Sequence, residues 1–367
     1  WFMMISKPTL VLNEQVCRNN IRQMAIKANQ LNVSFRPHFK THQSIEVGRW
    51  FRDYGIQKIA VSSVPMAKYF ANDGWNDITI AFPFVFQQGD EINTLSKRIN
   101  LNTTVSSEQN CVMLCKSITS RIGVYIEIDT GQNRSGLPHN DIKTIELILK
   151  HLLACKNIIF KGFISHAGQT YQANADSTIG ICSQATAQLA KLKHTFSNQF
   201  PDLEISFGDT PSSILCSSFE SVDEIRPGNF AFFDMQQQSK GVCMPSDIAI
   251  ALVCPVVAVY PSQLKACIWG GAIHLSKDYY EDKKYGKSFG SICRLNPDFT
   301  WSDPIEGLFL KSISQEHGII EATTPKSINQ LNEGDIVAVL PAHSCLTADC
   351  MGEYLVNGKY TVTMLNK

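Results

Sequence analysis

The sequence lacks an excess of charge of either sign. Lysine and arginine together number 33, as do aspartate and glutamate, and the formal net charge at pH 7 is zero. A chain without a basic field offers little to the phosphates of a nucleic acid, so we expect no nucleic-acid partner. No apolar run reaches the roughly 18 residues that a membrane-spanning helix needs, so we expect no membrane association.

The sequence also lacks the marks of a secreted protein and of a paired-cysteine metal site. Residues Trp1 to Ile5 are apolar, but this run is short and has no basic flank or cleavage site, so we expect a cytoplasmic protein. The 12 cysteines include no CxxC pair. Most lie in apolar segments, and in a reducing compartment we expect them to be small buried side chains.

What the sequence does contain is an alternation of short apolar runs and amphipathic segments. Eight runs with strand character lie near residues 31–35, 58–63, 77–82, 101–106, 123–129, 158–165, 203–207 and 222–226, and most are separated by helical spacing. Strands that alternate with helices pair in parallel. The pattern predicts a (β/α)8 TIM-type barrel over residues 13–240, and a doubly wound open sheet is the alternative.

The pattern changes after residue 240. Strand-like runs then follow one another without helices, and turns such as Asn357-Gly358 join them. We therefore predict an all-β domain over residues 241–367, either a sandwich or a small barrel, which residues 1–12 are expected to join.

The segment Arg36-Pro-His-Phe-Lys-Thr-His42 comes at the end of the first predicted strand. Crowding by Arg36, His38 and His42 should disfavour the ammonium form of Lys40 and lower its pKa. A lysine with a lowered pKa is what Schiff-base chemistry requires. A solvated strand end with ordinary basic side chains explains the same residues equally well.

Other polar clusters also follow predicted strands, where a barrel would gather them at one end. They are Asp129-Thr-Gly-Gln-Asn-Arg134-Ser-Gly136, Ser165-His166-Ala-Gly-Gln-Thr-Tyr171 and Gly208-Asp209-Thr210-Pro-Ser212-Ser213. Arg134 can lie against a planar anion, and His166 and Tyr171 suit acid–base work or ring stacking. The loop from Gly208 can hold a phosphate. A charged loop, a structural histidine and a Pro-Ser turn are the alternatives.

A possible metal site follows the predicted strand 336–340. Alternate residues of an extended chain point the same way, so His343 and Cys345 could reach one ion. Imidazole and thiolate are a good zinc pair. Only two ligands are visible, and an open site that water or substrate completes favours catalysis over a structural role.

Taken in chain order, these motifs resemble those of one family. The lysine segment, the three clusters, Glu224-Ile-Arg-Pro-Gly-Asn229 and the C-terminal His-x-Cys occur in the order seen in the D-serine dehydratase and D-threonine aldolase group. That group comprises pyridoxal phosphate enzymes of the alanine racemase-like fold, also called fold type III. The resemblance runs from about Pro8 to Tyr354.

The resemblance implies roles for individual residues. Lys40 would form the internal aldimine with pyridoxal phosphate, and Lys40, His166 and Tyr171 would be the catalytic residues. The remaining cofactor contacts would be His38, Arg134, Gly208, Asp209, Thr210 and Ser212. His343 and Cys345 would bind a divalent metal, zinc or manganese. Cysteine in this motif looks like the zinc-dependent dehydratases, and Gln169 stands where some relatives carry histidine.

The resemblance also implies the activity. It favours a pyridoxal phosphate- and metal-dependent lyase that removes water from small D-3-hydroxy amino acids by β-elimination, as D-serine dehydratase does, giving a 2-oxo acid and ammonia. The alternatives are D-threonine aldolase-type cleavage to glycine and an aldehyde, an amino acid racemase, or a non-catalytic pyridoxal phosphate carrier. By analogy with the family we expect a homodimer.

Overall fold

The computed structural model describes residues 5–365, which divide into two compact units. The barrel unit spans Gln23–Gly228, and the β unit combines the N-terminal residues up to Arg22 with Asn229 onward. From the sequence we placed these divisions at residues 12 and 240. They differ because Asn20, in helix α1 (Glu14–Gln30), donates hydrogen bonds to the carbonyls of Ala231 and Asp247, which ties this part of α1 to the β unit.

The barrel unit is built on eight parallel strands in the order β2-β10-β9-β8-β6-β5-β4-β3. Their bounds are β2 Ser34–Phe35, β3 Lys58–Val61, β4 Asp77–Pro83, β5 Asn100–Val105, β6 Ile122–Asp129, β8 Ile158–Ser165, β9 Glu204–Phe207 and β10 Glu224–Ile225. The segment after β2 is joined to β3 by an isolated parallel bridge between His38 and Ala60. The sheet is therefore a nearly closed (β/α)8 barrel, as the sequence predicts.

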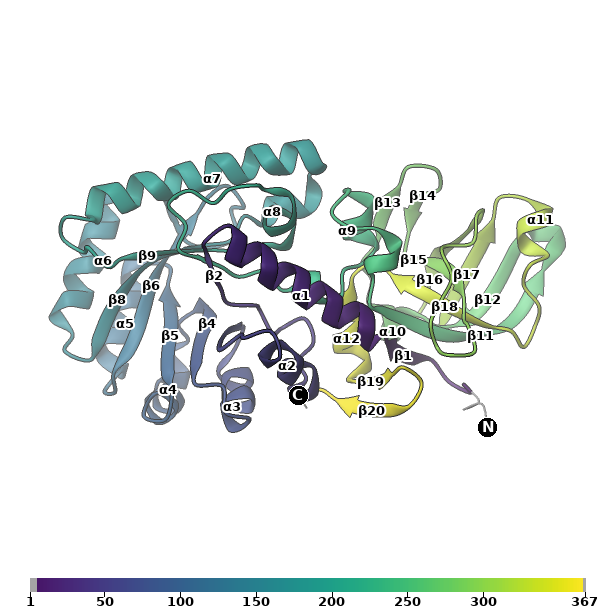
Figure 1. Cartoon of the computed structure of the whole chain (residues 1–367), viewed down its shortest axis with the longest axis horizontal. Coiled ribbons are helices and arrows are strands. Elements are labelled where there is room, and N and C mark those ends of the chain that lie inside the picture. Colours follow the sequence, from purple (N-terminus) through teal and green to yellow (C-terminus); the bar gives the residue numbers. More distant parts are fainter. Residues whose placement is uncertain (1–4, 366–367) are drawn as a thin grey trace. The chain divides into compact units, whose positions relative to one another are not determined.

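The barrel strands are connected through helices that lie around the outside of the sheet (Figure 1). These helices are α2 Ile45–Arg52, α3 Val64–Asn72, α4 Gly89–Ser96, α5 Glu108–Ser117, α6 Ile142–Ala154, α7 Ala175–Phe196 and α8 Thr210–Leu215. The 3-10 turns η1 Phe86–Gln88 and η2 Gly168–Gln172 and the short strand β7 Leu137–Pro138 complete the unit. Several helices begin after a residue whose side chain caps the helix N-terminus. Ser63, for example, accepts the Met66 N–H, and Ser107 accepts the Asn110 N–H.

The β unit contains a closed antiparallel barrel. Strands β11 Ile250–Tyr260, β12 Lys265–Trp269, β17 His317–Ala322, β16 Leu308–Ile313, β15 Gly290–Arg294 and β18 Ile336–Pro341 pair in that order, and β18 pairs back onto β11. The sheet continues from β11 through β1 Thr9–Leu12, β19 Glu353–Val356 and β20 Tyr360–Thr363. Of the two all-β folds that the sequence allows, the small barrel is therefore confirmed.

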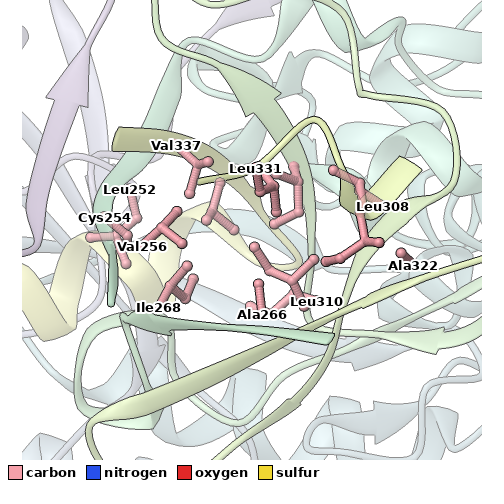
Figure 2. Packing of buried hydrophobic residues seen from close by; sticks show 14 of the residues in the cluster. Leu252, Cys254, Val256, Ala266, Ile268, Leu308, Leu310, Ala322, Leu331 and Val337 are labelled. Carbon is pink, nitrogen blue, oxygen red and sulfur yellow. The ribbon is translucent and has the colours of Figure 1, made fainter. Parts of the chain in front are cut away.

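The core of this small barrel is made by alternate side chains of its strands. Leu252 and Val256 of β11, Ile268 of β12, Leu310 of β16 and Val337 of β18 point toward one another (Figure 2). All five are at most 3% exposed. Alternation along each strand places them inside the barrel, and their burial is the main force that holds this part of the unit together.

Short elements connect the strands of the β unit. They are α9 Met235–Ser239, α10 Ala272–Leu275, α11 Pro325–Ile328, α12 Ser344–Met351, the hairpin β13 Tyr280–Asp282 and β14 Gly286–Ser288, and the 3-10 turns η3 Asn229–Ala231, η4 Pro245–Asp247 and η5 Pro261–Gln263. No helix within residues 5–365 is both long and apolar enough to cross a membrane.

The cysteines follow the sequence expectation with one exception. Seven of the ten free cysteines are buried. Cys115 and Cys155 instead form a disulfide, with Cα atoms 6.0 Å apart. This disulfide was not predicted from the sequence, because the two residues stand 40 positions apart and no spacing rule links them.

Candidate active site

The lysine segment closes the seam of the large barrel. β2 ends at Phe35, so Lys40 lies in a turn beyond the strand and not at its end. The His38 N–H donates to the Pro227 carbonyl at 2.9 Å, and the Phe39 N–H donates to the Ala60 carbonyl at 2.9 Å. These bonds tie the segment to the residues after β10 on one side and to β3 on the other, which fixes the backbone that carries Lys40.

Phe39 anchors this segment in the core. Its ring is fully buried and lies 4.4 Å from the His42 ring, 4.9 Å from Phe70 and 5.0 Å from Trp75, measured between centroids. Such aromatic packing adds to the free energy of burial. The next side chain, Lys40, is exposed. One residue therefore holds the turn in place while the side chain of its neighbour is exposed.

The basic neighbours of Lys40 are partly different from those expected. Arg36 is 3% exposed and turns into the barrel, where it binds Glu224 at 2.9 Å and Asp77 at 2.6 Å. His42 is buried among aromatic rings, and this burial lowers its pKa to about 3. The prediction that Arg36 and His42 crowd Lys40 with positive charge is therefore wrong, because one is neutralised by carboxylates and the other is itself neutral.

Other cations gather near Lys40 instead. Burial is the main cause that lowers the pKa of His166 to about 3, and the charges of Lys40, Arg134 and Arg226 contribute to the shift. Burial is also the main cause of the lowered pKa of His38, and Lys40, Arg226 and Arg134 again contribute. The structure thus brings together three cations and two neutral imidazoles from four separate loops. Such a group favours an anionic ligand.

The Gly208 loop is held in a fixed conformation. Asp209 caps α8, and its Oδ1 accepts the Ser212 N–H at 2.6 Å and the Thr170 hydroxyl at 3.0 Å. Burial raises the pKa of Asp209 to about 6, against the effect of these hydrogen bonds. A side chain at Gly208 would come within 2.9 Å of the Arg226 Cβ, so only glycine fits this close approach. A cofactor contact by Asp209 stays a prediction beside its role as a helix cap.

His166 and Tyr171 are both hydrogen-bonded to the Gly208 loop. The His166 Nδ1 is hydrogen-bonded to the Gly208 carbonyl, and the Thr210 N–H donates to the Tyr171 hydroxyl at 3.3 Å. The two rings lie 6.0 Å apart between centroids, tilted by 37°. Both side chains therefore stand beside the predicted phosphate loop, where they can contact a planar ligand.

Arg134 belongs to a tight turn after β6. The Asp129 Oδ1 accepts the N–H groups of Gly131 and Gln132, both at 2.9 Å, an arrangement typical of Asx turns. Gly131 has φ 118°, which favours glycine. The Gln169 amide donates to the Thr130 carbonyl at 3.1 Å, linking this turn to the loop that carries His166. Gln169 thus helps to hold the turn that carries Arg134.

Arg226 is a site residue that the sequence reasoning did not select. Its guanidinium donates to the Ser206 hydroxyl at 2.6 Å and to the Ser165 carbonyl at 2.8 Å. Burial lowers its pKa to about 10, although Glu224 acts in the opposite direction. The sequence did contain a signal for it, because Arg226 is the last residue of the eighth predicted strand.

The predicted metal pair lies in the β unit. His343 is the N-cap of α12, and Cys345 stands in the first turn of that helix. The His343 side chain is hydrogen-bonded to Cys345, and its Nδ1 lies 2.6 Å from the Asp278 carboxylate. Burial lowers the pKa of His343, but Asp278 and Cys345 outweigh burial and raise it to about 11. A carboxylate on one imidazole nitrogen leaves Nε2 for a metal.

The side chains of His343 and Cys345 meet as predicted, but the predicted backbone geometry is wrong. We expected an extended chain, but only His343 is extended, with φ −133°, and Ser344 and Cys345 are helical. The turn is set by Asp234, whose carboxylate accepts the Ser344 N–H at 3.0 Å and the Asn229 amide at 2.6 Å. Within residues 5–365, no group of three or more His, Cys, Asp or Glu side chains is placed to hold a metal.

Comparison with known proteins places the chain in a family. Residues 12–236 match the model of the alanine racemase N-terminal domain, and residues 249–357 match that of the family described as "Putative serine dehydratase domain". The chain therefore belongs to the alanine racemase N-terminal domain family, of fold type III.

Individual relatives match over nearly the whole chain. D-serine dehydratase of Dictyostelium discoideum is 26% identical over 96% of this chain and 93% of its own length. D-threo-3-hydroxyaspartate dehydratase of Delftia sp. is 26% identical over 94% of this chain and 92% of its own. A solved structure of the Delftia enzyme has a TM-score of 0.90, with 23% identity over all of this chain and 99% of that chain.

The barrel residues fit the cofactor that this family implies. Asp209 Oδ2, Ser212 Oγ and Arg226 Nε are buried and have no hydrogen-bond partner in the described part of the chain. Buried polar atoms are costly unless they are paired, so these atoms indicate a polar ligand. The local excess of positive charge suits the phosphate and phenolate of pyridoxal phosphate. Lys40 supplies the exposed amine that its aldehyde requires.

Proposed function

We propose that the protein is a pyridoxal phosphate- and metal-dependent lyase that acts on small D-3-hydroxy amino acids by β-elimination. The product would be a 2-oxo acid together with ammonia, as for D-serine. The observation that carries this proposal is the contact between His343 and Cys345, supported by Asp278. A racemase or a cofactor carrier has no evident use for a metal at this pair, whereas a bound metal would make a β-hydroxyl a better leaving group.

Each site residue would have a distinct role in the reaction. When bound, pyridoxal phosphate supplies an electron sink at the α-carbon, and a divalent metal supplies Lewis acidity at the β-oxygen. Lys40 would hold the cofactor and then take the α-proton. His38 and His166, whose pKa values are lowered mainly by burial, are neutral at pH 7, so each can hydrogen-bond a ligand without adding charge.

The other site residues would bind and orient. Arg134 would contact the phenolic oxygen of the cofactor, Tyr171 would lie beside its ring, and Gly208, Thr210 and Ser212 would hold its phosphate. His343, through Nε2, and Cys345 would hold the metal, with Asp278 fixing the orientation of the imidazole. This donor set favours zinc. That a relative binds metal is supported by a solved structure of D-threo-3-hydroxyaspartate dehydratase described as its metal-free form.

We further propose that the protein is a cytoplasmic homodimer with neither a nucleic-acid nor a membrane partner. The zero net charge supports the absence of a nucleic-acid partner. Size-exclusion chromatography with light scattering tests the dimer, and a mass equal to one chain would contradict it.

The decisive experiment is product analysis with D-serine and D-threonine, before and after chelation of metal. We expect ammonia and a 2-oxo acid, lost on chelation and restored by Zn²⁺. Glycine and an aldehyde would instead indicate the activity named for a more distant relative, D-threonine aldolase of Arthrobacter sp., which is 21% identical over 92% of this chain. Turnover that chelation leaves unchanged would contradict the metal-dependent proposal.

A further inference from the structure

The disulfide lies where two neighbouring barrel helices meet. Cys115 is in the last turn of α5, and Cys155 caps the C-terminus of α6. Their Cα separation of 6.0 Å falls in the usual range for a disulfide. The same two helices are joined by an ion pair between His151 of α6 and Glu108 of α5, at 3.2 Å. The helices are therefore held in register by contacts other than the sulfur bond.

The surroundings distinguish this pair from the nearest other thiol. Cys111 lies one turn earlier on α5 and is fully buried, which raises its pKa to about 12. Its sulfur lies 3.8 Å from the Ile148 carbonyl. Cys115 and Cys155 are only half-buried, so a reagent in water can reach them. Oxidation should therefore be selective for Cys115 and Cys155 and should leave Cys111 a thiol.

The loop that the disulfide closes contains part of the candidate active site. Cys115 and Cys155 stand 40 positions apart, and the residues between them include β6, the Asp129 turn, Arg134 and α6. A cross-link between the ends of a loop this long removes much conformational freedom from the unfolded chain, which stabilises the folded segment relative to it. The segment that presents Arg134 lies within this loop.

We propose that Cys115 and Cys155 are a reversible redox modification site, and that their disulfide stabilises the segment that carries Arg134. The inference does not depend on the reaction that the enzyme performs. It assigns a covalent, oxidant-dependent state to two cysteines that take no part in binding the cofactor or the metal.

The chemistry is thiol–disulfide exchange with a low-molecular-weight disulfide. The thiolate of one cysteine attacks that reagent, forms a mixed disulfide and releases one small thiol. The second cysteine then attacks the mixed disulfide, which forms the Cys115–Cys155 bond and releases the other small thiol. Two protein thiols lose two electrons and two protons, and the reagent gains them. In a reducing compartment such bonds are transient and report the redox state.

The proposal is tested on the full chain, equilibrated with either oxidised glutathione or dithiothreitol. Peptide mapping of the oxidised protein should find residues 115 and 155 linked, and residue 111 still alkylated as a free thiol. The melting temperature should rise by roughly 5–15 °C on oxidation. Amide exchange in residues 122–141 should slow several-fold.

Matched variants separate the disulfide from general effects of oxidant. Cys115→Ser and Cys155→Ser should each lose the redox-dependent shift, and Cys111→Ser should keep it. Because the reduced wild-type protein is itself a reference, a variant that fails to fold does not end the test. A linkage to another cysteine, or a melting temperature that oxidation leaves unchanged in the wild type, would overturn the proposal. Exchange that slows equally in all regions would show that the disulfide has no particular effect on the Arg134 segment.

Discussion

Lys40 is set apart from the other lysines by its surroundings. It stands on a turn that a buried phenylalanine anchors, and the charges of Lys40, Arg134 and Arg226 all act on the nearby His166 imidazole. The local positive charge that we expected from Arg36 and His42 therefore comes from Arg134 and Arg226, which lie in other loops of the barrel.

The first prediction concerns Lys40 itself. Lys40→Ala should abolish covalent attachment of pyridoxal phosphate, and with it the near-visible absorbance of the bound cofactor, because no other amine occupies this position. Lys68→Ala, which changes an exposed lysine paired with Glu91 on the outer helices, is the matched control and should keep the absorbance. Borohydride reduction followed by mass mapping would reveal the attachment site. A spectrum of Lys40→Ala equal to that of the wild type would exclude the assignment.

Sequence reasoning selects neighbouring side chains when they lie in the loops that follow predicted strands. Lys40, His166 and the Gly208 loop were selected for that reason, and the structure places these loops at the same end of the barrel. Asp278 was missed because it lies in a loop of the β unit and meets His343 only through the fold, 65 positions away. Arg36 was misassigned because its sequence neighbours do not reveal that carboxylates inside the barrel hold it.

Helix α12 carries the predicted metal pair. Its N-cap is His343, and Asp234 holds its first turn. From the sequence we expected these two residues to lie on an extended chain, because a continuous apolar run precedes them. The strand ends at Pro341, so the two side chains meet across the start of a helix instead.

The second prediction follows from this element. His343→Ala and Cys345→Ala should each abolish stoichiometric metal binding, measured by inductively coupled plasma mass spectrometry. Asp278→Asn should weaken metal affinity by about 10- to 100-fold, because the amide no longer fixes the imidazole through a charged hydrogen bond. His317→Ala changes an exposed histidine of the same unit and serves as the control. Retention of metal by both His343→Ala and Cys345→Ala would rule out this site.

Across the molecule, the alternation of strands and helices was sufficient to predict the architecture. All eight barrel strands lie at the predicted places, because parallel strands buried on both faces give clear apolar runs. Contacts between residues far apart in the sequence could not be predicted from it. The Cys115–Cys155 bond, and the hydrogen bonds that tie part of α1 to the β unit, depend on contacts that no local pattern encodes.

The third prediction concerns the response of the whole molecule to acid. Burial lowers the pKa of His42 to about 3, so the unfolded chain binds more protons than the folded one between pH 3 and 6.5. Stability therefore falls as the pH drops through this window. His166 and Glu224, with lowered pKa values, act in the same direction, and Asp209, with a raised pKa, opposes them.

The size of this effect can be measured by urea unfolding at pH 7 and pH 5. His42 alone should account for about 2 kcal/mol of the loss. In His42→Asn the difference between the two pH values should shrink by about that amount, even if the variant is less stable at both. His194→Asn changes a solvated helix residue and should leave the difference unaltered. An undiminished difference in His42→Asn would show that its imidazole is protonated in the folded state.

The closure of the small barrel has a consequence for how the protein behaves at high concentration. Because β11 and β12 pair, the six strands of that barrel present no open edge to another chain. The nine-stranded sheet ends instead at β20, which has four residues, three of them exposed. Long unpaired edges recruit strands from neighbouring molecules and start aggregation, whereas a short polar edge does so poorly. The fold therefore protects a strand-rich unit from amyloid-like assembly by topology, without relying on a surplus of charge that this chain does not have.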